Sequence, residues 1–427
     1  MKVTKELLDR AMTEDLKKEI IDMTADMVNI PSPTGEELAM AKYVAQRYEE
    51  LGLEVQLQEV EPERYNVIAR LKGSGGGKSL MLNGHFDTST TGKENLKELG
   101  IGHRPKAVIK DGWMYGLGVS NMKCAFSAYY GTVKLLQEVK PDLKGDVVIT
   151  GVVGEIEKAP VDEYQGRIYR GGGCGAISLM QHGIVTDMCI DAEPTGLRLQ
   201  PYNCGFIFAR ITTKGVAMHT WCKEFGVDAI DKMLVVIEEV KKWGQEFEAK
   251  NPHPRMKPRV GIGAIRGGYP FKPSICPSPF CNLYIDIRML PQQSIIDVKN
   301  ELKAVIRRLG ERYDELADTE VSFYIARPGY EEPEGSEICR VMERAHKEVF
   351  GQDVDYPVGY RSAVSSDTMI FHHYGIPSVT YGPGGIQRNG VYSMYDGHHG
   401  ECLGLDNLIQ SCKVYALAAV DICNTPA

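Results

Sequence analysis

The sequence predicts an α/β protein in which a smaller α+β domain is inserted into the main domain. Short apolar segments typical of buried strands alternate with helical segments towards both ends of the chain. After Cys204 the pattern changes to longer strands and long amphipathic helices over about 115 residues, the size of a compact domain. A chain of 427 residues, 43% of them hydrophobic, is long enough for two such domains. We expect a main domain at residues 1–204 and 321–427, and an inserted domain at 205–320.

The N-terminal segment should contain helices followed by strands. The charged, amphipathic start of the chain predicts a helix, which the Pro and Gly residues of "PSPTGEE" interrupt. A second helix is expected at "TGEELAMAKYVAQRYEELG", with Thr34 as its N-cap. Strands are then expected at "VQLQEV", "NVIARLKG" and "KSLMLNGHFD", because their apolar residues alternate or form continuous runs.

The rest of the chain continues the same alternation around the insertion. A helix at "AFSAYYGTVKLL" is followed by strands at "GDVVITGVVGE" and "VTDMCIDAEPT". The inserted domain should contain strands at "GFIFARITTKG" and "CNLYIDIRML", with helices at "VDAIDKMLVVIEEVKKWGQEFEAK" and "SIIDVKNELKAVIRRLGERYDELA". The main domain then resumes with a helix at "SEICRVMERAHKEVF" and a strand at "PSVTYGPGG".

Composition excludes several classes of partner. The net charge is −8 and no basic block is present, which argues against nucleic acid or an anionic membrane as the main partner. No apolar run approaches the ~18 residues of a membrane span, and the N-terminus lacks the apolar core of a signal peptide. We therefore expect a cytoplasmic protein whose 11 cysteines are reduced and mostly buried.

Polar side chains that could bind a metal follow four of the expected strands. Ligand sites in α/β sheets lie beyond the carboxyl ends of strands, and imidazole and carboxylate groups together suit zinc or manganese. A lone histidine is more often structural, but a carboxylate two residues away can orient the imidazole of a ligand. The side chains at these four places are His85 and Asp87, Glu155 and Glu157, Asp191 and Glu193, and His398 and His399.

A series of motifs extends this pattern over nearly the whole chain. In order they are "NGHFDT", "GLGVSNMKCA", "VVGEIEK", "IDAEPTG", "GVAMHT", "IDIRMLP" and "GIPSVTYGPGG". The series resembles the M20 family of metallopeptidases and aminoacylases. The resemblance implies a catalytic α/β/α domain with a two-metal centre and an inserted lid domain that also mediates dimerisation.

The resemblance also implies roles for individual residues. His85 and Glu193 match ligands of the first metal, and Asp87 matches the carboxylate that orients His85. Glu155 matches the general base that takes a proton from water at the metal.

The resemblance implies roles for three further positions in the chain. His219 matches a lid histidine that stabilises the oxyanion, and Arg288 matches an arginine that binds a substrate carboxylate. The last histidine ligand is His398 or His399, of which we expect His399.

The sequence departs from the family at two positions of the second metal site. Asn121 stands where the family has a bridging aspartate, and Ile156 stands where it has a glutamate ligand. Two cations need an anionic bridge, whereas an amide offers one neutral oxygen. We therefore expect one divalent metal per chain, manganese or zinc, with Asn121 in its ligand set. Alternatively, Glu157 supplies the missing ligand, since residues 155 and 157 would share a face if this segment were a strand.

The function expected from these features is hydrolysis of a C–N bond in a small carboxylate-bearing substrate. Within the family the chain is most similar to enzymes that deaminate nitroaromatic amines, which implies conversion of 5-nitroanthranilate to 5-nitrosalicylate and ammonia. The alternatives are a deacylase or exopeptidase acting on N-acyl amino acids or small peptides, and a non-catalytic binding protein. Further substrate contacts are expected from Arg266, Tyr269, Arg361 and Tyr381.

Overall fold

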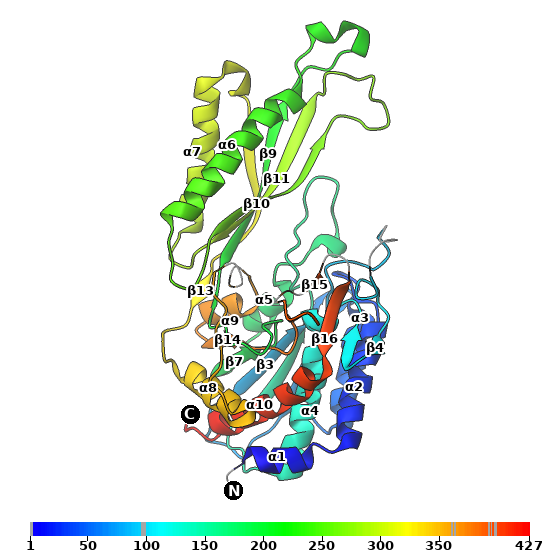
Figure 1. Ribbon diagram of the computed structural model, residues 1–427, viewed down its shortest axis with the longest axis vertical. Helices are drawn as coiled ribbons and strands as arrows, with labels where there is room; N and C mark the ends of the chain where they lie inside the picture. The colour runs from blue at the N-terminus through cyan, green and yellow to red at the C-terminus, as the bar shows by residue number, and fades with distance from the viewer. Residues whose placement is uncertain are drawn as a thin grey trace. The chain divides into compact units, whose positions relative to one another are not determined.

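The chain divides into two compact units, each described here by itself (Figure 1). The computed structural model describes residues 3–94, 100–359, 362, 364–391, 393, 395–396 and 399–427. The main unit comprises Met1–Tyr202, Glu332–Pro357 and Ser366–Ala427, and the inserted unit comprises Asn203–Glu331 and Val358–Ser365. The expected α/β class with an inserted domain is confirmed.

The main unit is built on a six-stranded sheet. Its strand order is β1 (Glu54–Glu61), β2 (Arg64–Leu71), β6 (Val147–Val152), β3 (Leu80–His85), β7 (Met188–Asp191) and β14 (Ser378–Thr380). The strands from β6 to β14 run parallel, whereas β2 is antiparallel to both of its neighbours. The carboxyl ends of β3, β6 and β7 therefore meet at one edge of the sheet, where a ligand site is expected.

Helices cover both faces of this sheet. Leu80 and Leu82 of β3 belong to a large core with the helices of one face, whereas Met81 packs on the other face. Burial on both faces explains why β3 is an almost continuous apolar run. The first face carries α1 (Lys5–Ala11), α2 (Glu14–Asn29), α3 (Leu38–Glu50), α4 (Cys124–Val139), α8 (Glu337–Phe350) and α10 (Leu405–Cys423), and the second carries α5 (Cys174–Gln181) and α9 (Thr368–His373).

A second, smaller sheet in the main unit lies beside the start of α4. Its order is β15 (Tyr395–Asp396), β16 (Gly400–Gly404), β5 (Trp113–Tyr115) and β4 (Val108–Lys110). A short π-helical segment, η1 (Val119–Lys123), leads from β5 into α4 and contains Asn121 in a non-helical conformation. A further short element of the main unit is the 3₁₀ turn η2 (Arg167–Tyr169). The two-residue strands β8 (Tyr202–Asn203) and β13 (Tyr330–Glu331) pair with each other.

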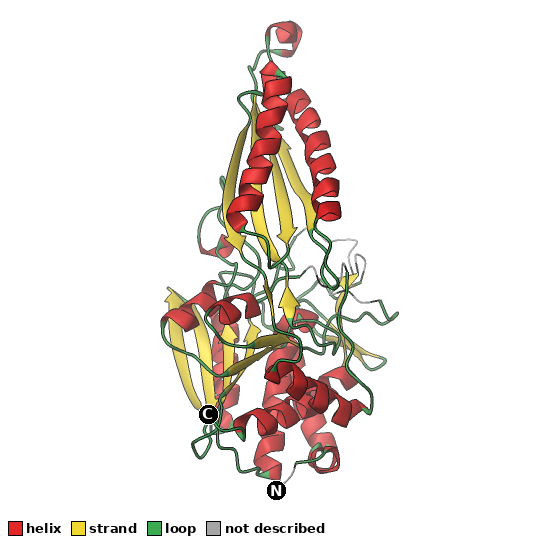
Figure 2. Ribbon diagram, turned by 90° about the vertical axis from the view of Figure 1, so that its left-hand side faces the viewer, coloured by secondary structure: helices red, strands yellow, loops and turns green. Residues whose placement is uncertain are grey.

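The inserted unit is an antiparallel sheet covered by two long helices on one face (Figure 2). Apolar residues of the sheet and of both helices form a separate core. The strand order is β10 (Arg259–Gly267), β11 (Phe280–Met289), β9 (Gly205–Lys214) and β12 (Glu320–Arg327), the helices are α6 (Ala229–Lys250) and α7 (Ile295–Arg312), and the 3₁₀ turns are η3 (Thr220–Phe225) and η4 (Asp314–Leu316).

The inserted unit ends further along the chain than expected, at Glu331 instead of residue 320. Strand β12 pairs with β9 along most of its length, so the chain remains in this unit up to Glu331 instead of leaving it at residue 320. The separate segment Val358–Ser365 also belongs to it.

Two local expectations were wrong. Helix α3 begins at Leu38 after Glu37, and the Thr34 hydroxyl donates to Oδ2 of Asp87 at 2.8 Å instead of capping the helix. Strand β6 ends at Val152, so residues 155 and 157 do not share a strand face. Among the described residues, no helix combines the length and apolar character that crossing a membrane requires.

Candidate metal centre

Three buried side chains converge at the carboxyl edge of the main sheet. His85 is the last residue of β3, Glu155 follows the end of β6, and Glu193 follows the end of β7. Each offers a ligand atom within 4.8 Å of the others. The Nε2 atom of His85 lies 3.8 Å from Oε2 of Glu155 and 3.5 Å from Oε1 of Glu193. Three neighbouring strands thus bring together residues that lie between 38 and 108 positions apart in the chain.

The spacing of these atoms suits a divalent cation. Tetrahedral ligands about 2.1 Å from a zinc ion lie roughly 3.4 Å from one another. A fourth atom, Oδ1 of Asn121, lies 3.0 Å from Nε2 of His85. One imidazole with carboxylate and amide oxygens is a donor set that zinc and manganese accept. The residues present therefore fit a metal ion.

The orientation of His85 is fixed by the main chain of Asp87. Nδ1 of His85 lies 2.9 Å from the Asp87 carbonyl oxygen, which can only accept, so Nδ1 carries a proton. Nε2 is thereby directed at the carboxylates. The Asp87 carboxylate is 3.5 Å from Nδ1 and accepts the backbone N–H groups of Glu155 at 3.0 Å and Ile156 at 3.2 Å. Asp87 thus contacts both His85 and the segment that carries Glu155.

The electrostatics of the group favour a bound cation. Burial raises the pKa of Glu155 well above its usual value, and the nearby Glu193 raises it further. Burial also raises the pKa of Glu193 to about 7, although His85 opposes this shift. Burial alone would lower the pKa of His85, but Asp87, Glu193 and Glu155 raise it overall. A divalent cation would offset the repulsion between these carboxylates.

A second layer of buried acids adjoins this group. The side-chain amide of Asn83 donates to Asp191 at 3.1 Å and to Asp367 at 3.4 Å. Burial and the charge of Asp191 raise the pKa of Asp367 to about 8. Asp367 was not among the expected site residues, because it precedes helix α9 and does not follow an apolar strand. Burial thus favours the neutral form of these two carboxyls, which the Asn83 amide holds behind the candidate ligands.

Asn121 is held by a glutamate that is remote in sequence. The buried Glu401 carboxylate accepts the backbone N–H groups of Gly118 at 2.9 Å, Ser120 at 3.0 Å and Asn121 at 3.0 Å. These bonds fix the turn that places the Asn121 amide oxygen beside His85. The sequence contained no local signal for this role, since Glu401 acts on a turn about 280 residues earlier.

Ile156, Glu157 and His399 do not join the group of three buried side chains. Ile156 contributes its backbone N–H to Asp87, and the half-buried Glu157 is not part of the group of three. His399 is exposed and lines a separate cavity of about 450 Å³ with Ile101 and Lys110, because it occupies the turn before β16. His399 is therefore not in the group of three in this structure, its role as a metal ligand stays a prediction, and His398 lies outside the described residues.

Tyr381 is a core residue instead of a substrate contact. Its side chain is fully buried, and its hydroxyl lies 2.8 Å from Nδ1 of His346 on α8. The apolar segment in which it lies buries it in the main core, so the expectation for Tyr381 was wrong. Arg361, another expected contact, lies outside the described residues.

The remaining expected contacts belong to the inserted unit. Arg288 is half-buried, and its guanidinium donates to Asp286 at 2.9 Å and to Ser365 at 3.0 Å. The exposed His219 precedes η3. Arg266 on β10 and Tyr269 are also exposed. The structure describes these four residues within their own unit, so their roles at the metal centre stay predictions.

Known proteins resemble this chain in sequence and in fold. The chain is 24% identical over 417 residues to the N-formyl-4-amino-5-aminomethyl-2-methylpyrimidine deformylase of Halalkalibacterium halodurans, covering 91% of each protein. It is 27% identical over 300 residues to the acetylornithine deacetylase of Vibrio campbellii, covering 67% of this chain and 70% of that protein. A dinuclear metal-binding peptidase from Bacillus subtilis has the same fold, with a TM-score of 0.66 at 16% identity over 97% of this chain and 100% of that one.

The extent of the family match decides the classification. The region that matches runs from β3 to α10 and includes all three members of the buried group, His85, Glu155 and Glu193. Residues 81–421 match peptidase family M20/M25/M40, and the chain therefore belongs to this family of metal-dependent hydrolases.

Proposed function

We propose that the protein is a one-metal hydrolase that cleaves a C–N bond in a small carboxylate-bearing substrate. The observation that carries this proposal is the composition of the site. His85, Glu155 and Glu193 form a buried group, whereas the positions expected to complete a second metal site are a neutral Asn121 and an apolar Ile156.

His85, Glu193 and Asn121 would hold the cation, which when bound lowers the pKa of water and polarises the substrate. Glu155 acts as the general base and takes a proton from the attacking water. After it has taken up this proton, the same carboxyl can pass it to the leaving nitrogen. Asp87 holds the backbone of Glu155 while these transfers occur.

The substrate that we propose is 5-nitroanthranilate. The water oxygen forms a bond to the ring carbon that carries the amine, and the para nitro group accepts the electron pair. The pair returns to the ring as the C–N bond breaks, and the proton held by Glu155 leaves with ammonia. The products are 5-nitrosalicylate and ammonia. Support comes from the sequence resemblance and from the altered second metal site, and Arg288 is proposed to bind the carboxylate, with Arg266 and Tyr269 as further contacts.

Hydrolysis of an N-acyl group is the second candidate. The deformylase and the deacetylase that resemble this chain act on formyl and acetyl groups attached to nitrogen. The same base and cation would serve such an amide, with attack at a carbonyl carbon instead of a ring carbon.

A substrate panel separates these candidates. Purified protein with added manganese or zinc is incubated with 5-nitroanthranilate, N-formyl and N-acetyl amines, and dipeptides, and ammonia and free amine are measured. Ammonia from 5-nitroanthranilate alone supports deamination. Release of formate, acetate or amino acids instead assigns an acyl or peptide hydrolase. Binding without turnover of any compound contradicts an enzymatic role.

A further inference from the structure

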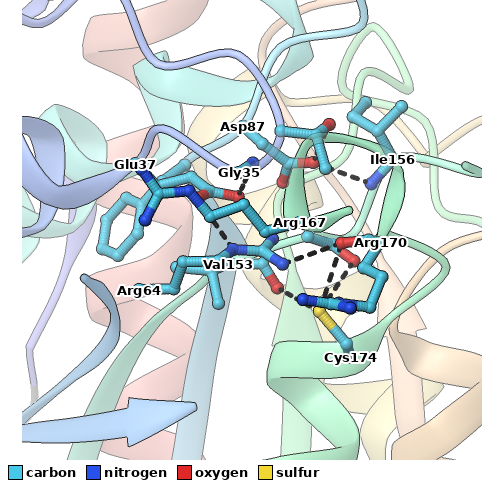
Figure 3. Close-up of polar contacts among 12 residues, drawn as sticks. Gly35, Glu37, Arg64, Asp87, Val153, Ile156, Arg167, Arg170 and Cys174 are labelled. Carbon is cyan, nitrogen blue, oxygen red and sulfur yellow. Dashed lines mark hydrogen bonds and ion pairs between the residues drawn. The ribbon is translucent and has the colours of Figure 1, made fainter. Parts of the chain in front are cut away.

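The segment that carries Glu155 contains the short 3₁₀ turn η2 but no α-helix or β-strand. It lies between the end of β6 at Val152 and the start of α5 at Cys174, and hydrogen bonds determine its path (Figure 3). On one side, Asp87 accepts the N–H groups of Glu155 and Ile156. On the other side, the Ile156 carbonyl accepts the N–H of Gly172 at 2.8 Å. The position of Glu155 therefore depends on what holds these two sides.

A fully buried ion pair lies next to this segment. Arg64 on β2 donates to Glu37 through Nη2 at 2.6 Å and through Nε at 3.0 Å, and neither side chain is exposed (Figure 3). Its Nη1 atom donates to the Arg170 carbonyl at 2.8 Å. A Cβ atom added to Gly154 would lie 2.5 Å from Nη2 of Arg64. The guanidinium thus packs directly against the residue before Glu155.

The same ion pair is connected to the opposite side of the segment. Oε1 of Glu37 accepts the N–H of Gly35 at 2.9 Å. The neighbouring Thr34 donates its hydroxyl to Asp87, whose carboxylate holds the Glu155 backbone. Glu37 therefore supports the loop that anchors Asp87, while Arg64 supports the segment at Gly154 and Arg170.

A contribution to folding stability does not by itself explain why a buried Arg–Glu ion pair is present here. Two buried charges usually stabilise a fold no more than well-packed apolar side chains would, because the cost of desolvation offsets their attraction. A bidentate guanidinium does, however, fix geometry closely. We infer that Glu37 and Arg64 are positioning residues that hold Glu155 in place for catalysis. This inference rests on the proposed role of Glu155 as the base.

The test compares kcat, KM and cation affinity in the full-length protein, using the substrate found with the panel. Arg64→Met should lower kcat about 100-fold, the scale expected when a reacting group moves by about 1 Å. KM and the cation Kd should stay within about twofold, because His85 and Glu193 follow other strands. Arg64→Lys and Glu37→Gln should each retain more activity than Arg64→Met. The control is Arg70→Met. Arg70 lies on the same strand as Arg64, and this substitution breaks its partly exposed ion pair with Asp146 at 2.6 Å.

Three results would overturn the inference: unchanged kcat in the folded Arg64 variants, an equal loss in Arg70→Met, or a parallel loss of cation affinity. Hydrogen exchange of the peptide spanning residues 153–158 provides a measurement that is independent of turnover. Faster exchange in Arg64→Lys than in Arg70→Met is expected, and equal exchange contradicts the inference. If the wild-type protein turns over no compound of the panel, the proposed function fails, and exchange alone then decides whether the pair positions this segment.

Discussion

The side-chain oxygen of Asn121 belongs to a neutral amide, whereas a site for two cations needs a carboxylate at this position. The Asn121 amide oxygen lies 3.0 Å from Nε2 of His85, where a carboxylate would add a negative charge. We predict that Asn121→Asp binds manganese or zinc about tenfold more tightly, as expected for a charge-assisted contact. Stoichiometry should remain one, because Ile156 still offers no ligand.

Calorimetry and elemental analysis measure both quantities for Asn121→Asp. Asn389→Asp places the same charge on an exposed residue and should leave the affinity unchanged. An unaltered affinity in Asn121→Asp would contradict a role for residue 121 in binding the cation.

Glu155 is the residue on which turnover should depend most. Glu155→Gln preserves shape but removes the base, so the rate should fall by about 10²- to 10⁴-fold, while cation affinity changes only a few-fold. Steady-state rates and calorimetry measure the two effects. Glu157→Gln is the matched control, because Glu157 lies two residues away and outside the buried group. Loss of cation binding in Glu157→Gln would instead favour Glu157 as the missing ligand.

At the scale of elements, Glu401 on β16 connects the small sheet to the turn before α4. Its carboxylate accepts three backbone N–H groups, including that of Asn121. Glu401→Gln replaces one acceptor oxygen with a donor amide, which leaves buried N–H groups unsatisfied. We predict a loss of about 1–3 kcal/mol in the free energy of unfolding, together with weaker cation binding. Urea denaturation measures the loss, and the exposed Glu138→Gln on α4 should show none.

Helix α8 should confer a pH dependence on stability through His346. This histidine stacks on Phe350 with ring centroids 4.5 Å apart and contacts Tyr381, and burial lowers its pKa. The unfolded chain therefore binds a proton more readily than the folded protein as the pH falls below the usual histidine pKa of about 6.5. Folding stability should accordingly decrease in acid.

The comparison of wild type with His346→Gln isolates this effect. Between about pH 7.5 and about pH 5.5, wild type should lose more stability than the variant, by at most about 1.4 kcal/mol per pH unit for one proton. Chemical denaturation at each pH measures the difference. An identical pH dependence of the two proteins would exclude His346 as the cause.

At the scale of the whole molecule, the inserted unit presents an uncovered sheet edge. Strand β10 ends the sheet, and its Ile262 and Ile265 side chains are 39% and 51% exposed. Long, exposed and apolar edges are normally covered, since they pair readily with other strands. We predict that the protein is a dimer in which this edge is covered by a second copy.

Ile265→Lys should shift the dimer towards monomer in light scattering of the purified protein. Leu57→Lys is the control, because Leu57 is 45% exposed on β1, the edge strand of the main sheet. A wild-type monomer, or dissociation caused equally by Leu57→Lys, would contradict the prediction.

The sequence by itself determined the α/β class, the insertion and the three central residues of the site. Strands β3, β6 and β7 are apolar runs followed by polar residues, and this local pattern is enough to place His85, Glu155 and Glu193 at strand ends. Strand β10 was not predicted from the sequence, because its three glycines are unfavourable in a strand and most of its residues are exposed. The family resemblance showed that Asn121 and Ile156 replace expected metal ligands, but it did not reveal which residues these two contact.

The tertiary structure alone decided which distant residues support that site and which do not reach it. Glu401 holds the Asn121 turn, Asp87 holds the Glu155 backbone, and Tyr381 is buried in the core. Periodicity reports whether a segment's own residues are buried, whereas these contacts join positions up to about 280 residues apart. Such contacts arise only when the sheet order is fixed, because neighbouring strands bring together side chains that no local pattern relates.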